Sequence, residues 1–127
     1  MAGFAGLLVF ALLGVALESF HAFKTPLYLD VGNEARRLMW RLAHAHGVLL
    51  SLLNVVYGLA ADRFSELRRP LAARALIAAM VLLPVGFFAG GIAVRGGDPS
   101  AGVVLVPFGA AALVAALVSI VLSLRAR

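Results

Sequence analysis

The chain contains no cysteine among its 127 residues. This absence excludes disulfide bonds, thiolate metal ligands and thiol catalysis, so a bound metal would need histidine, carboxylate or methionine ligands. Charged residues are also scarce, at 13%, and the eleven Lys and Arg fall in short clusters between long apolar runs. A nucleic-acid-binding surface requires a continuous basic face, so we expect no nucleic-acid partner.

The sequence motifs of soluble enzymes are missing too. No phosphate loop, no HExxH and no Ser-His-Asp order occurs, so hydrolase and nucleotide chemistry of the soluble type has no support. What the chain does have is apolar side chain, because 63% of its residues are hydrophobic and its mean hydropathy is +1.03. A water-soluble domain of this size cannot bury so much apolar surface, which must therefore face lipid.

Four windows are long and apolar enough to cross the hydrocarbon core of a bilayer: Ala2–Phe23, Leu38–Ala61, Leu71–Val94 and Gly102–Leu124. We keep the first as a membrane helix, not a secretory signal, because no basic residue precedes it and no cleavage pattern follows it. Short connections make consecutive helices antiparallel. The sequence thus predicts an all-α integral membrane protein, a single domain over 1–127 folded as an up-down-up-down four-helix bundle.

The third and fourth windows each contain a proline followed by small residues, at Pro84 and Pro107. A proline inside a helix removes a backbone hydrogen bond, so both are predicted to bend their helices without breaking them. Glycines such as Gly86 and Gly109 allow neighbouring backbones to approach closely. We favour close helix packing here, with a gate or hinge as the alternative.

Ionisable residues inside the apolar windows are few, and they gather near one membrane face. Glu18 and His21 lie three residues apart near the end of the first window, and His44 and His46 lie near the start of the second. Because these two helices are antiparallel and joined by a short connection, all four residues fall on the same side of the membrane. A charged group inside a bilayer is costly, so this cluster is the candidate site.

The two histidines are separated by about 200° on an ideal helix, which puts them on opposite faces. His46 shares its stripe with Asn54 and Tyr57, whereas His44 lines up with Arg37 and Ser51. One bundle cannot turn both stripes inward. The pattern therefore predicts a homo-oligomer or a larger membrane complex, with the small-residue faces of the third and fourth helices as a second contact surface.

Two main hypotheses fit the cluster, and a proton relay or a substrate pocket is a third. In the first, Glu18 pairs with a histidine or with Arg41 in a hydrogen-bond network at the interface, supported by Asn54 and Tyr57. The chain is then a non-enzymatic membrane protein, an oligomer or an accessory subunit.

In the alternative, Glu18, His21 and His44 or His46 bind a metal ion or haem, as in a redox protein. The HAH sequence at 44–46 is similar to the haem-ligating HxH helices of haem-copper oxidase-like proteins. Beside the cluster, Trp40 and Tyr28 are predicted to anchor the chain in the aromatic belt of the membrane.

Three short segments resemble the small four-helix membrane proteins of the YwdK and YgdD kind, known in bacteria and with mitochondrial relatives. They are HAFK at 21–24, comparable to AHALK in that family, HAH at 44–46, and PFG at 107–109. The chain departs from the family at Glu18, where small glycine-rich residues are usual. The resemblance implies a four-helix fold and a bacterial inner-membrane location, and it implies no chemistry.

Overall fold

The structure is a computed structural model that describes residues 1–125; residues 126–127, the last two of the predicted domain, lie outside the described residues. Within 1–125 the long helices are α1 (Ala2–Ala22), α3 (Glu34–Arg63), α4 (Pro70–Gly90) and α5 (Leu105–Arg125). The short α2 (Pro26–Leu29) and the 3-10 turns η1 (Val31–Asn33), η2 (Ser65–Leu67) and η3 (Ala101–Val104) connect them. Four helical spans are long and apolar enough to cross a membrane, which confirms the predicted all-α fold.

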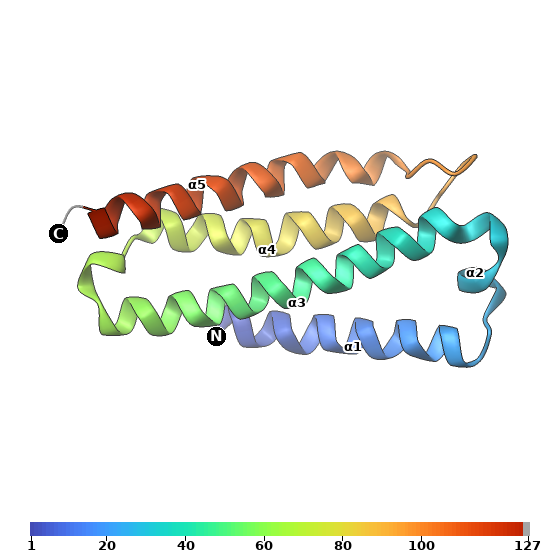
Figure 1. Ribbon diagram of the computed structural model, residues 1–127, viewed down its shortest axis with the longest axis horizontal. Helices are drawn as coiled ribbons and strands as arrows, with labels where there is room; N and C mark the ends of the chain where they lie inside the picture. Colours follow the sequence, from blue (N-terminus) through green and yellow to red (C-terminus); the bar gives the residue numbers. More distant parts are fainter. Residues whose placement is uncertain (126–127) are drawn as a thin grey trace.

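The long helices lie side by side in the order α1, α3, α4, α5, each antiparallel to the next (Figure 1). α1 also touches α4, where Gly6 lies beside Met80. The largest buried cluster joins α3, α4 and α5 through Tyr57, Leu76 and Ala116. In this arrangement α3 has α1 on one flank and α4 on the other, and the outer helices α1 and α5 expose most of their apolar side chains to lipid.

Helix α3 is longer than the predicted window 38–61. At 30 residues it measures about 45 Å, against about 30 Å for the hydrocarbon core, so it reaches beyond the core or tilts within it. It begins after Asn33, which occupies the N-cap position. The Asn33 side chain makes no capping bond and instead donates from Nδ2 to the backbone oxygen of Pro26, 3.2 Å away.

The two helix prolines differ in their positions. Pro84 lies inside α4, which continues on both sides of it from Pro70 to Gly90. Pro107 is the third residue of α5, directly after η3. In the first turn of an α-helix the missing N–H has no intrahelical acceptor, so a proline at position 107 requires no bend there, and the bends at Pro84 and Pro107 stay predictions.

Glycines bring α4 and α5 into close contact. A Cβ added at Gly109 would lie 2.7 Å from the backbone nitrogen of Leu83, and one added at Gly86 would lie 2.9 Å from that of Val106. The prediction of close packing is thus confirmed. Gly86 and Gly109 thus meet inside the chain, whereas Ala111 and Ala115 on α5 stay exposed, so the contact surface for another subunit stays a prediction.

Candidate functional site

His44 and His46 point to opposite sides of α3, as their spacing predicts. On the α1 side, His44 Nδ1 donates a hydrogen bond to the backbone oxygen of Phe10 at 2.8 Å. On the α4 side, the His46 ring lies 4.9 Å from the ring of Phe87, and its Nδ1 donates to Leu42 O, one turn earlier on its own helix, at 2.9 Å. The two imidazoles therefore cannot share one ligand.

Gly14 of α1 makes room for His44. A Cβ added at Gly14 would lie 2.5 Å from His44 Cε1 and 2.9 Å from Nδ1, which is closer than ordinary van der Waals contact. The absence of a side chain at position 14 lets the imidazole reach the backbone of α1. The stripe that runs from Gly14 through Glu18 to His21 consequently faces α3.

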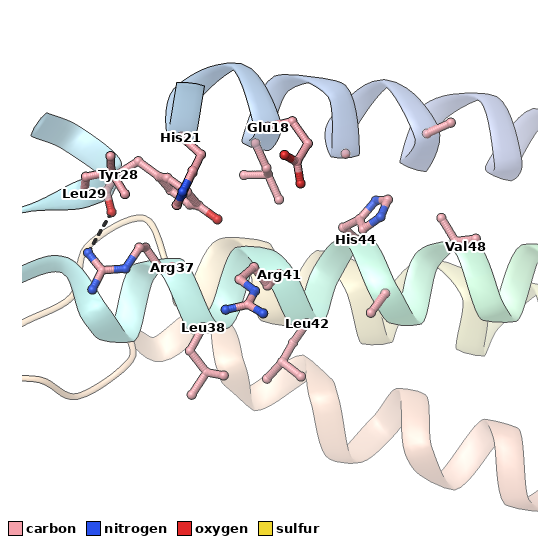
Figure 2. A pocket seen from close by; sticks show the side chains of 14 residues that line it. Glu18, His21, Tyr28, Leu29, Arg37, Leu38, Arg41, Leu42, His44 and Val48 are labelled. Atoms are coloured by element: carbon pink, nitrogen blue, oxygen red, sulfur yellow. Dashed lines mark hydrogen bonds between the residues drawn. The ribbon is translucent and has the colours of Figure 1, made fainter. Parts of the chain in front are cut away.

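An open groove runs between α1 and α3 on the side of the chain where α1 ends and α3 begins. Its volume is about 1290 Å³. Figure 2 shows Glu18 extending from α1 towards α3, and His44 pointing from α3 towards α1. The lining residues are Ala11, Gly14, Leu17, Glu18, His21, Tyr28, Leu29, Arg37, Leu38, Arg41, Leu42, His44, Ala45 and Val48.

The groove collects four residues of the predicted cluster, Glu18, His21, Arg41 and His44. Within residues 1–125, however, no hydrogen bond or ion pair joins any two of these side chains, so the expected direct network is not formed. Nor do three His, Asp or Glu side chains of this range lie close enough together to hold a metal ion. A centre that uses all of Glu18, His21, His44 and His46 is therefore not assembled.

The other stripe of α3 faces α4 and lies outside the groove. Asn54 donates from Nδ2 to Leu76 O at 3.2 Å, and the Tyr57 hydroxyl donates to Leu67 O at 2.7 Å. The prediction that Asn54 and Tyr57 support the Glu18 cluster is thus wrong. Because α3 is flanked by α1 and α4, each of its polar stripes faces another helix of the same chain, and two stripes therefore no longer require an oligomer.

Trp40 and Tyr28 are buried, which corrects their assignment to an aromatic belt. Their exposed fractions are 8% and 4%, and their rings stack at 6.3 Å and 13°. Trp40 also stacks on Phe88 at 5.3 Å and donates from Nε1 to the Phe88 backbone oxygen at 3.1 Å. The aromatic rings therefore join α2, α3 and α4, and Tyr28 also lines the groove.

Arg36 and Arg37, to which the sequence analysis assigned no role in the site, link the segments at the end of the molecule where α3 begins. Arg36 donates to the backbone oxygens of Gly91 at 3.0 Å, Ile92 at 3.2 Å and Leu27 at 3.0 Å. The first two carbonyls lie at the end of α4, where helical carbonyls lack intrahelical donors. A basic residue at the start of α3 could have been matched to them, because α4 ends on the membrane side where α3 begins.

Arg37 secures the first connection in a similar way. Its Nη1 donates to the backbone oxygens of Tyr28 at 3.1 Å and Asp30 at 3.0 Å, and its Nη2 lies 3.7 Å from Glu34 Oε1. The bond to Tyr28 is drawn in Figure 2. Arg37 lines the groove, but its donors are largely committed to the backbone.

No family model matches the chain, and no curated protein or solved structure matches it either. The resemblance to the YwdK and YgdD proteins therefore stays a prediction.

Proposed function

We propose that the chain is a small non-enzymatic membrane protein that binds another component of the membrane in the groove between α1 and α3. The observation behind this proposal is that Glu18 and Arg41 line the groove while neither makes a hydrogen bond or ion pair with another residue of the described range. Ionisable groups within membrane-spanning segments are costly without partners. A bound molecule would supply the partners that the chain does not.

The composition of the lining favours binding over catalysis. Its fourteen residues include no serine, threonine, cysteine or lysine, the side chains that most often serve as nucleophiles. Apolar residues form most of the wall. A few polar groups placed in a mostly apolar concavity are typical of a ligand site.

Native mass spectrometry of the protein released from a mild detergent tests the proposal. We expect wild-type protein to carry a bound molecule and Ala45→Trp, which fills the groove from an exposed position on its wall, to lose it. Val114→Trp is the matched control, because Val114 is 59% exposed on α5, away from the groove. Wild-type protein without a bound mass, or equal occupancy in both variants, would contradict the proposal.

A second candidate function is that of an oligomer or accessory subunit. It is favoured by α5, whose outer face exposes Ala111 and Ala115 one turn apart, since small residues let another helix approach closely. The cysteine-free chain permits a clean test by single cysteines. Oxidation of Ala111→Cys in membranes should give a crosslinked dimer or a crosslink to another protein, and Leu8→Cys on the exposed face of α1 should not.

The cellular membrane in which the chain lies is also part of this proposal. The four apolar helices make the chain a multi-pass membrane protein. For the particular membrane we propose the bacterial inner membrane, on the resemblance to the YwdK and YgdD proteins. Fractionation of cells that express the chain at native level would test this assignment.

A further inference from the structure

The groove has a charged end and an apolar end. Glu18, His21 and Arg41 lie at the end where α1 finishes and α3 starts, whereas Ala11 and Val48 lie at the opposite end. Seven residues separate Ala11 from Glu18, and seven separate Arg41 from Val48, so the apolar part extends about 10 Å deeper along both helices. The groove thus reproduces the polarity gradient of one leaflet, from headgroups to acyl chains.

Small residues give the deep part of the groove its room. Ala11 on α1 and Ala45 on α3 line it with no more than a methyl group each, whereas the space beside Gly14 is filled by the His44 ring. Leu42 and Val48 complete the apolar wall. An extended hydrocarbon chain fits such a wall, because it needs contact along its length and no hydrogen bonds.

The shallow part offers one cation and one anion. Arg37 is committed to Tyr28 O and Asp30 O, whereas Arg41 and Glu18 are both exposed and bond to no other residue of the described range. A guanidinium fork matches the oxygens of a phosphate, and a carboxylate matches an ammonium group. A ligand that satisfies both must therefore carry both charges.

We propose that the occupant is a single glycerophospholipid with an ammonium headgroup, its phosphate against Arg41, its ammonium beside Glu18, and one acyl chain along Ala11, Ala45 and Val48. This inference rests on the proposed binding function of the groove. A phospholipid places its phosphate at the level of the helix ends and its tail towards the membrane centre, which is the order of polar and apolar residues found here. An anionic lipid without an ammonium group leaves Glu18 unpaired beside a second negative charge.

The test is a lipid competition. Wild-type protein is reconstituted in vesicles of equal amounts of phosphatidylethanolamine and phosphatidylglycerol, extracted in mild detergent, and its retained lipid is identified by native mass spectrometry. We expect phosphatidylethanolamine to be enriched about tenfold, the ratio that one charge-assisted hydrogen bond supports. Glu18→Gln should bring the two lipids close to parity, and Arg41→Gln should reduce retention of both about tenfold.

Two exposed residues at the other end of the molecule provide matched controls. Asp62→Asn and Arg74→Gln change the same charges outside the groove, and both should keep the wild-type lipid ratio. Arg41→Lys keeps the charge without the fork and should fall between wild type and Arg41→Gln, provided that the thermal stability of each variant matches wild type.

The outcomes separate this inference from the proposed function. Retention of phosphatidylglycerol, equal retention of both lipids by wild type, or a bound peptide mass would overturn the headgroup assignment while the groove stays a binding site. Equal loss of the bound lipid from Asp62→Asn and Glu18→Gln would overturn the headgroup assignment as well. Wild-type protein that carries no molecule at all would remove the binding function itself.

Discussion

The contacts of α4 with α5 and of α1 with α3 are both built on glycine, but they differ along their length. Between α4 and α5, Gly86 and Gly109 each face the backbone of the other helix, and buried Ala116 joins the common core. Between α1 and α3, Gly3 and Gly6 fit against Ser51 at one end, and the other end opens into the groove at Glu18 and Arg41.

The difference shows where close packing between two helices gives way to an open groove. Small residues allow two backbones to touch, and long charged side chains prevent it, because their charged ends must reach water, a counter-ion or a ligand. α1 follows this rule within a single helix: its first half has glycine against α3, and its last turns have Glu18 and His21. The closed contact fixes α1 against α3, and the open end is the part of the contact to which we assign the proposed binding site.

The largest expected effect is at the α4 and α5 contact. Gly109→Leu should lower the free energy of unfolding by about 3 kcal/mol, because the new side chain meets the backbone of Leu83, which cannot move aside. The measurement is thermal or denaturant unfolding in detergent. Gly58→Leu is the control, since a Cβ there has nothing within 4 Å, and it should stay within about 1 kcal/mol of wild type. Equal losses in both variants would show that the contact is not closed.

An intermediate effect on stability is expected to distinguish Arg36, which bonds to backbone oxygens, from Arg41, which bonds to none within residues 1–125. Arg36→Gln should cost about 2 kcal/mol, because the carbonyls of Leu27, Gly91 and Ile92 lose a charged donor. Arg41→Gln should change stability by less than about 0.5 kcal/mol, since Arg41 bonds to no other residue of the described range. Unfolding curves of both variants measure the difference. A larger loss for Arg41→Gln would mean that Arg41 stabilises the fold and is not reserved for a ligand.

The smallest effect compares two buried serines. Ser51 is fully buried at the closed end of the α1 and α3 contact, and its Oγ has no hydrogen-bond partner among the described residues, whereas Ser123 Oγ donates to Ser119 O at 2.6 Å. Ser51→Ala should leave stability unchanged or raise it by up to about 1 kcal/mol, because a buried unpaired hydroxyl is unfavourable. Ser123→Ala should have a lower free energy of unfolding than Ser51→Ala in the same assay. The reverse order would indicate a partner for Ser51.

Much of the fold could be predicted from the sequence because lipid imposes simple requirements. Long apolar windows and short polar connections are enough for four antiparallel membrane helices, and the structure has them. Helix ends were predicted less well: α4 ends at Gly90 instead of Val94, where Ser100 Oγ donates to Ala89 O at 2.7 Å and Arg36 donates to the carbonyls that follow. Those donors come from other segments, so hydropathy along α4 contains no sign of them.

The candidate site, too, could be predicted only in part from the sequence. Helical periodicity by itself placed His44 and His46 on opposite faces of α3, and it placed Glu18 and His21 on one face of α1. Only the tertiary structure decided which neighbour each face meets. Because α3 lies between α1 and α4, His44 joins Glu18 in the groove, while His46 packs on Phe87 and Asn54 and Tyr57 bond towards α4. Periodicity fixes an angle about one helix axis, and the identity of the neighbour depends on packing between helices, which residues far apart in the chain determine together.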